Sequence, residues 1–161
     1  MVVISDTTAI TNLIRLDLLF VLPELYGEIL IPTAVYDELS VYGNQKAIID
    51  NSSWIQTIQI SGSETLDKLL LSMDRGEAEA IMLAIELNPD YLIIDELLGR
   101  EMAKAYNIEV IGLLGILVLS KEEGLIESVS QHLTILKNEI GFRISDKLYD
   151  IILKKANEKD S

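Results

Sequence analysis

Hydrophobic and polar positions along the chain follow a pattern that predicts a parallel β-sheet with crossover helices. Short apolar or β-branched runs, typical of buried strands, alternate with longer stretches in which apolar residues recur at helical spacing. Strands are predicted at residues 2–5, 28–31, 55–60, 91–94 and 109–111. Because helical stretches separate these strands, the predicted fold class is α/β.

Between the strands, helices are predicted at residues 7–15, 18–26, 32–41, 63–71, 75–86 and 96–106. Pro32 suits the first turn of its helix, because the amide hydrogen that proline lacks would have no partner there. One segment stays open at this point: residues 43–53 fit either a short helix or an ordered loop.

After the fifth strand the pattern becomes helical, at residues 113–123, at 126–138 and from Asp146 onward, with Ser145 as the expected N-cap of the last helix. The chain has 161 residues, which is enough for one compact domain and too few for two ordinary ones. We therefore expect a single domain over residues 1–161, with residues 120–161 as a helical C-terminal extension packed on the core.

The amino-acid composition gives the chain a strong negative charge. The chain has 13 Lys and Arg residues against 26 Asp and Glu residues, a formal net charge of −13, together with 49% apolar residues and a mean hydropathy of +0.30. The apolar content excludes a disordered acidic chain. The charge argues against a general nucleic-acid binder, whose surface would be basic. Bases for RNA binding would have to come mostly from the second half, where the candidates are Arg100, Lys104, Lys121, Lys137, Arg143 and Lys147.

Several chemistries are excluded because the chain has no cysteine and one histidine, His132. Disulfide frameworks, cysteine-rich zinc sites, cysteine nucleophiles and two-histidine acid–base catalysis all need residues that are missing. The first six residues hold no basic segment and end in Asp6, which is unlike a signal peptide. The longest apolar run, residues 110–119, is half of the roughly 20 residues that a membrane helix requires. We expect a soluble cytoplasmic protein.

Two carboxylates follow predicted strands directly: Asp6 comes after the first strand and Asp95 after the fourth. In open α/β sheets, ligands bind at the carboxyl ends of the strands, where the strand order reverses. If these two strands are neighbours, both carboxylates face one crevice. The alternative is that each aspartate is simply the N-cap of the helix that follows it.

Three glutamates on predicted helices extend this set. Glu38 lies at the margin of an apolar stripe, where an acid either reaches water or points into a cleft. Glu77 fits a capping box with Asp74. Glu77 and Glu79 are about 200° apart around their helix, so both cannot face one site. Because Glu77 shares its face with Ile81, we expect Glu77 on the buried side and Glu79 as the weaker candidate.

Asp6, Glu38, Glu77 and Asp95 together form a set of carboxylates without a histidine or cysteine partner nearby. Burying unpaired carboxylates costs several kcal/mol each, so their convergence implies protonation or bound cations. Sites with only oxygen ligands suit Mg²⁺ or Mn²⁺ rather than zinc.

The acids lie in motifs whose order and spacing are characteristic. These motifs are Ser5-Asp6-Thr7-Thr8 with Asn12 one turn on, Pro32 followed by Glu38-Leu39, Gly76-Glu77-Ala78-Glu79-Ala80-Ile81 with Ala84, Ile94-Asp95, Gly112-Leu113-Leu114-Gly115, and Gly141-Phe142-Arg143-Ile144-Ser145. Over about residues 1–120 the chain resembles PIN-domain proteins of the VapC-like type, which are toxins of prokaryotic toxin–antitoxin pairs. It is most similar to a branch that is often left uncharacterised.

The resemblance implies a three-layer α/β/α sandwich around a parallel sheet of about five strands. It also implies a ribonuclease in which one or two Mg²⁺ or Mn²⁺ ions serve RNA phosphodiester hydrolysis. The catalytic and metal-binding acids carried over from it are Asp6, Glu38, Glu77 and Asp95. The supporting residues are Thr7, Asn12, Glu79, Glu96 and Arg100. The implied partners are RNA, a cognate antitoxin and a second copy of the chain, with no membrane.

Two alternatives remain beside this interpretation. Arg100 is placed to contact phosphate or, equally well, to pair with Glu96 one turn earlier. The chain as a whole also fits a PIN-like binding or regulatory protein with weak or no nuclease activity. The acidic composition, the scarcity of bases in residues 1–99, and Ile93, where many relatives have threonine, support that second function.

Overall fold

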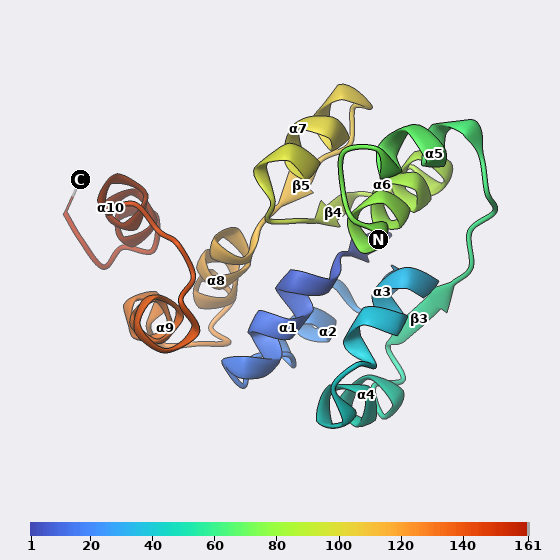
Figure 1. Cartoon of the computed structure of the whole chain (residues 1–161). Helices are drawn as coiled ribbons and strands as arrows, with labels where there is room; N and C mark the ends of the chain where they lie inside the picture. The colour runs from blue at the N-terminus through green and yellow to red at the C-terminus, as the bar shows by residue number, and fades with distance from the viewer. Residues whose placement is uncertain (161) are drawn as a thin grey trace.

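Five short parallel strands form the centre of the molecule in the computed structural model, which describes residues 1–160 (Figure 1). The strands are β1 (Val3–Ser5), β2 (Ile29–Pro32), β3 (Ile55–Ile58), β4 (Tyr91–Ile93) and β5 (Val110–Ile111). Every predicted strand is present, with ends that differ by one or two residues. The sheet order is β3-β2-β1-β4-β5, and every pairing is parallel.

The strand order reverses beside β1. From β1 the chain moves outward through β2 and β3, and then returns to place β4 on the other side of β1. The register pairs Ile4 with Leu92 and Ser5 with Ile93. The first and fourth strands are therefore neighbours, and their carboxyl ends meet at one point on the sheet edge.

Ten α-helices and one π-helical turn connect and flank the strands in the described part of the chain. They are α1 (Thr7–Arg15), α2 (Val21–Tyr26), α3 (Thr33–Leu39), α4 (Gly43–Asp50), α5 (Glu64–Leu70), α6 (Arg75–Leu87), α7 (Leu97–Ala105), α8 (Leu113–Glu122), α9 (Val129–Ile135), η1 (Leu136–Ile140) and α10 (Asp146–Lys155). No helix within residues 1–160 combines the length and the apolar content needed to cross a membrane.

Some helix ends differ from their prediction. Residues 43–53, which fitted either a short helix or an ordered loop, contain helix α4. Pro32 lies outside the first turn of α3, because β2 continues through it and it pairs with Ile58 of β3. The helix predicted at 126–138 begins later, at Val129, and ends in the π-helical turn. Ser145 caps α10 as predicted, since its hydroxyl accepts a hydrogen bond from the Leu148 amide at 3.1 Å.

Two hydrophobic cores cover the two faces of the sheet. Alternate strand residues point to opposite sides, so Val3 and Ile93 join one cluster while Ile4 and Leu92 join the other. The first core contains residues of α1, α2 and α8, and the second is built on α5, α6 and α7. The fold is thus a three-layer α/β/α sandwich, as predicted.

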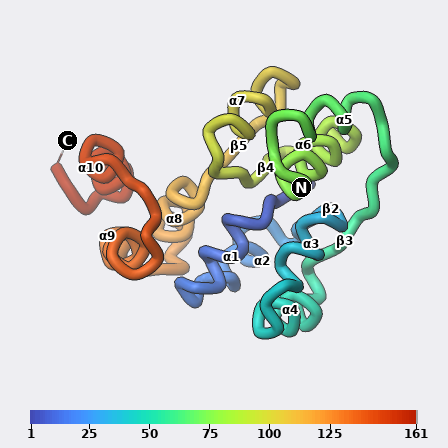
Figure 2. Tube along the Cα trace, viewed as in Figure 1, coloured from blue at the N-terminus to red at the C-terminus, as the bar shows by residue number. Residues whose placement is uncertain are grey.

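The last three helical segments extend the first core. Figures 1 and 2 show α9 and α10 beyond α8, at the end of the molecule opposite β3 and α4. Val129, Leu133 and Leu136 are fully buried in the first core, and Ile152 joins them from α10. Glu158 fastens the end of the chain to the start of α9, because its carboxylate accepts hydrogen bonds from the Val129 amide at 2.7 Å and the Ser130 amide at 3.0 Å.

Candidate active site

Asp6 lies where β1 ends, beside the end of β4. Its backbone amide donates to the Ile93 carbonyl at 3.0 Å, and its side chain is 1% exposed. One carboxylate oxygen, Oδ1, accepts a hydrogen bond from the Ala9 amide at 3.3 Å, so Asp6 is the N-cap of α1. The second oxygen, Oδ2, is buried and has no partner among residues 1–160. Asp6 is therefore both a helix cap and a carboxylate with one free oxygen.

Asp95 follows β4 at the same edge of the sheet. It does not cap its own helix, whose N-cap is Glu96, so the N-cap alternative is wrong for this residue. Its Oδ1 instead accepts a hydrogen bond from the Leu113 amide at 2.9 Å, at the start of α8. Its Oδ2 is buried and also lacks a partner in the described chain. Each aspartate thus has one oxygen fixed by a backbone amide and one left free.

Gly112 allows this arrangement. A Cβ atom at this position would lie 2.7 Å from Asp95 Oδ1 and 2.6 Å from Arg100 Nη1, closer than atoms of a real side chain can approach. Sequence reasoning placed Gly112 in a motif and missed this role. Its signal was a glycine directly after a strand, at the edge of the sheet where ligands bind.

Burial and neighbouring charges raise the pKa of the two aspartates. Burial raises the pKa of Asp6 well above its usual value, and the charge of Asp95 raises it further, against the lowering effect of the Ala9 amide. Burial also raises the pKa of Asp95, against the lowering effects of the Leu113 amide and the Arg100 guanidinium. Without a cation, these two carboxyl groups hold their protons more tightly than exposed aspartates do.

Glu77, at the start of α6, also has a raised pKa. Its backbone amide donates to Asp74 Oδ1 at 2.9 Å, which confirms that Asp74 caps this helix. The side chain is half-buried, and burial together with the charges of Asp74 and Glu96 raises its pKa to about 7. Glu77 therefore changes protonation near neutral pH.

Glu38 is turned inward rather than toward water. Its Oε2 accepts a hydrogen bond from the Thr7 hydroxyl, and its Oε1 accepts one from the Gly76 amide at 3.1 Å. These contacts tie α3 to the starts of α1 and α6. A Cβ atom at Gly76 would collide with the Glu38 carboxylate, which explains why glycine stands there.

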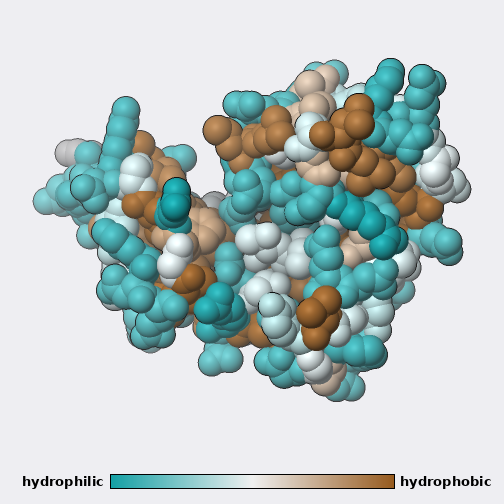
Figure 3. Space-filling view, viewed as in Figure 1, coloured by the Kyte–Doolittle hydropathy of each residue, from teal (hydrophilic) through white to brown (hydrophobic). Residues whose placement is uncertain are grey.

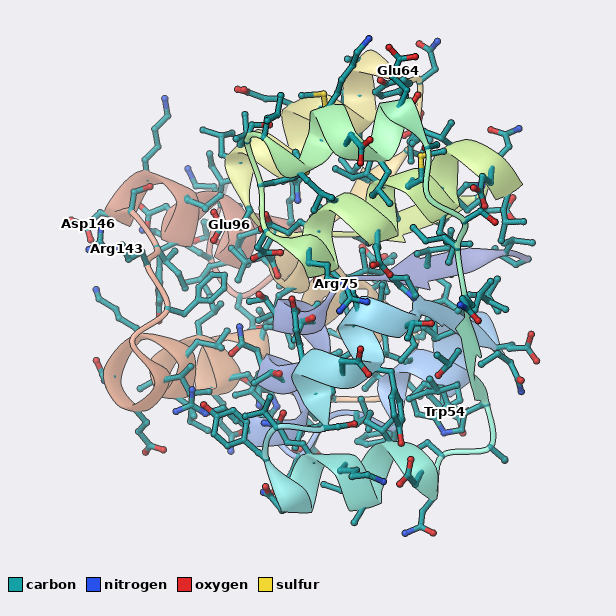
Figure 4. All side chains as sticks on the ribbon, turned by 45° about the vertical axis from the view of Figure 1, so that its right-hand side comes forward. Trp54, Glu64, Arg75, Glu96, Arg143 and Asp146 are labelled. Atoms are coloured by element: carbon teal, nitrogen blue, oxygen red, sulfur yellow. The ribbon has the colours of Figure 1, made fainter. Side chains whose placement is uncertain are left out.

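Glu79 has a structural role that differs from its prediction. It is only 7% exposed and more buried than Glu77, so the expected order of burial on this helix is wrong. Its Oε1 accepts from the Ala34 amide at 3.1 Å, and its Oε2 accepts from Arg75 Nε at 2.9 Å. Figure 4 shows Arg75 between α6 and α3. Both carboxylate oxygens of Glu79 are thus occupied by contacts within the protein.

Two roles are open for Arg100 from the sequence, a phosphate contact and an ion pair with Glu96, and the structure bears on the second. Its Nη1 donates to the Ile94 carbonyl at 3.2 Å, and no ion pair between Arg100 and Glu96 occurs in the part of the chain that the structure describes. Glu96 is exposed at the start of α7. Asn12 is buried on α1.

The donor set fits a divalent cation in its chemistry. Two buried carboxylate oxygens without a partner, Asp6 Oδ2 and Asp95 Oδ2, lie at the ends of neighbouring strands within residues 1–160. Glu77 is a third acid nearby, since its charge raises the pKa of Asp6. Oxygen ligands of this kind suit Mg²⁺ or Mn²⁺. In the present arrangement of residues 1–160, no three acidic side chains lie close enough to share one ion.

Comparisons with known proteins agree with this architecture. A family model described as a PIN domain matches residues 2–158. A solved structure of a PilT N-terminus domain protein from the hyperthermophilic archaeon Sulfolobus solfataricus P2 is similar at a TM-score of 0.57 and 19% identity, covering 74% of this chain and 93% of that chain. At this identity the likeness concerns the fold alone. No protein of curated function matches the sequence.

Proposed function

This chain belongs to the PIN-domain family, a fold that generally carries nuclease activity, and on that basis we propose that it is an Mg²⁺- or Mn²⁺-dependent endoribonuclease. The observation that carries the proposal is the pair of buried, unpartnered oxygens Asp6 Oδ2 and Asp95 Oδ2 at the strand switch point, within the described chain. Buried polar atoms in native proteins are nearly always satisfied, so two free oxygens at a ligand-binding edge favour a cation there.

Asp6 and Asp95 would hold the ion through these two oxygens, with Glu77 as the third candidate ligand. Their other oxygens accept hydrogen bonds from the Ala9 and Leu113 amides, which keeps each carboxylate oriented without help from the ion. When bound, Mg²⁺ or Mn²⁺ activates water for attack on phosphorus and offsets the charge of the phosphate. Glu38 would support the site by fixing Thr7 and Gly76, since each of its two oxygens accepts a hydrogen bond from one of these residues.

Glu77 and Arg100 have separate parts in the proposed reaction. The pKa of Glu77 is about 7 in the metal-free protein, and a divalent cation bound beside it would lower that pKa and favour the carboxylate form that a ligand needs. Arg100 lines a groove next to Asp95, where a guanidinium group offers hydrogen bonds to a phosphate.

The proposal is tested by measuring metal binding and cleavage separately. We expect Mn²⁺ at 100 times its Kd to stabilise the protein by about 2.7 kcal/mol, a rise in melting temperature of roughly 5–10 °C for a chain of this size. We also expect EDTA to abolish cleavage of single-stranded RNA. Asp6→Asn keeps the capping oxygen for Ala9 and should lose both responses, whereas the matched exposed control Asp67→Asn should keep them. Cleavage that persists in Asp6→Asn and Asp95→Asn would contradict the proposal.

A second candidate function is a PIN-like binding or regulatory protein with little or no nuclease activity. It is favoured by the absence, within residues 1–160, of three acids close enough to share an ion, and by the net charge of −13. No cleavage of any RNA tested, together with no rise in melting temperature with Mn²⁺, would support this function over the first.

The proposal extends to a role as the toxin of a toxin–antitoxin pair, acting as a homodimer that a cognate antitoxin inhibits. Its support is the resemblance of the motifs to VapC-like proteins. Co-purification with the product of the neighbouring gene, together with the mass of the isolated protein in solution, tests both partners.

A further inference from the structure

A groove of about 480 Å³ runs beside Asp95, between the main body and the C-terminal helices. One wall comes from α7, β5 and the start of α8, and the other from the segment 142–155. Figure 3 shows the surface hollowed between the C-terminal helices and the rest of the molecule. The groove therefore begins at a proposed metal ligand and leads away from it along the C-terminal extension.

The groove is locally basic in an acidic protein. The charged side chains that line it are Arg100, Arg143 and Lys155 against a single carboxylate, Asp95. Figure 4 shows Arg143 on the segment that leads into α10. Among residues 1–160, neither Arg143 nor Lys155 has a carboxylate within 4.0 Å, so their charges are not cancelled by an ion pair. An anionic ligand fits this surface.

The apolar side chains that line the groove indicate which kind of anionic ligand it fits. Phe142 lies beside Arg143, and Leu97, Leu148 and Ile152 complete an apolar wall. Proteins bind single-stranded nucleic acid by this combination, with cations along the phosphates and an aromatic ring under a base. Paired bases in a duplex are not free to stack on such a ring.

We propose that this groove binds the single-stranded RNA segment next to the scissile phosphate. Arg143 and Lys155 contact its phosphates, and Phe142 stacks against a base. The inference rests on the proposed ribonuclease function, which it deepens by assigning the form of the substrate and the surface that holds it. Sequence reasoning named Arg143 among the candidate bases, placed Phe142 in a motif without assigning it a role in binding, and did not name Lys155 as a candidate base.

Binding is measured by fluorescence anisotropy of a labelled single-stranded RNA of about ten nucleotides, with Ca²⁺ present and the RNA checked on a gel for integrity. We expect Arg143→Gln and Lys155→Gln each to weaken binding about fivefold at 0.1 M salt and to reduce the slope of log affinity against log salt by about 0.7. Phe142→Leu is expected to weaken binding by about tenfold.

Two exposed lysines serve as controls, Lys154 on the same helix as Lys155 and Lys68 on α5. Lys154→Gln and Lys68→Gln change the net charge equally, but neither residue lines the groove, so binding should change by less than about twofold. Equal effects in the groove and control variants, or no RNA binding at all, overturn the inference. Binding of a glutamate-rich peptide through Arg143 and Lys155 in preference to RNA also overturns it, because the groove would then serve a protein.

These outcomes are separable from those of the proposed function. If RNA is cleaved with Mn²⁺ but Arg143→Gln and Lys155→Gln behave like their controls, the ribonuclease stands and the groove assignment fails. If no cleavage occurs but the groove variants selectively lose RNA binding, the groove stands and the ribonuclease fails. Melting temperatures of all variants, taken without RNA, show whether any loss of binding comes from unfolding.

Discussion

Replacing Glu77 with glutamine should stabilise the metal-free protein, although the residue belongs to the candidate site. The folded-state pKa of Glu77 is raised from 4.5 to about 7 by burial and by the charges of Asp74 and Glu96. Between pH 4.5 and 7 the unfolded chain therefore binds fewer protons at this position than the folded chain. Stability contributed by this group falls as the pH rises through that window and stays at its low value above it.

The magnitude follows from the size of the pKa change. At 1.36 kcal/mol per pH unit, the full change corresponds to at most about 3.4 kcal/mol. Glu77 is only half-buried, and water screens its repulsion from neighbouring acids, so a gain of about 1–2 kcal/mol at pH 8 is a realistic expectation for Glu77→Gln. In a chain of 161 residues this corresponds to a rise in melting temperature of about 3–6 °C.

The assay is a set of thermal melts in EDTA from pH 4 to pH 8, with Glu86→Gln as a control. Glu86 is exposed in the last turn of the same helix, so its replacement makes the same charge change outside the acidic cluster. Because a negative charge is unfavourable at a helix C-terminus, Glu86→Gln should gain less than about 1 kcal/mol. The gain from Glu77→Gln should be absent near pH 4 and complete at pH 8. A gain that does not depend on pH, or one that Glu86→Gln shares, refutes the argument that buried repulsion acts at Glu77. In Mn²⁺ the order should reverse, because the variant loses a ligand.

Three further predictions concern positions around the site. Gly112→Ala should destabilise the protein by about 1–3 kcal/mol and reduce the Mn²⁺-induced rise in melting temperature, because the new Cβ atom would displace Asp95. The control Gly62→Ala, which has open space around it, should do neither. Glu79→Ala should cost about 1–3 kcal/mol in urea melts by leaving the Ala34 amide unpaired, yet keep the Mn²⁺ response; loss of that response would make Glu79 a ligand. Glu158→Gln should lower stability at pH 7, where the wild-type carboxylate is charged. Burial raises the folded-state pKa of Glu158, but hydrogen bonds from the Ser130 and Val129 amides and from Lys121 outweigh it and lower this pKa to about 2. The difference from wild type should therefore shrink as the pH falls from 4.5 toward 2.

The sequence predicts the parts of this structure that depend on local pattern. Strand and helix positions follow from periodicity, and the placement of Asp6 and Asp95 follows from the rule that parallel strands end at one edge. The sequence did not show whether the first and fourth strands are neighbours, because the pairing of β1 with β4 joins residues more than 80 positions apart.

Errors arose where a contact is distant in sequence or where a helix is buried on several sides. The partner of Asp95 is the Leu113 amide, 18 residues away, and no local pattern indicates it. The burial of Glu79 was misjudged because helical spacing assumes one buried face, whereas α6 packs against the sheet and against α3, α5 and α7. The ion pair of Arg100 with Glu96 was one of two alternatives for this residue and is absent within residues 1–160, where Arg100 Nη1 donates to the Ile94 carbonyl.

Four acids at and around the candidate site accept hydrogen bonds from amide groups at the starts of helices. Asp6 accepts from α1, Asp95 from α8, Glu38 from α6 and Glu79 from α3. The positive ends of four helix dipoles thus offset part of the negative charge before any cation arrives. Because these helices also build the two cores, the carboxylates are ordered already in the metal-free protein. Of the three proposed metal ligands, Asp6 and Asp95 are ordered in this way, whereas Glu77 accepts no such hydrogen bond within residues 1–160, so metal binding would have to order its side chain. This ordering buries little apolar surface, so metal binding should lack a strongly negative heat-capacity change.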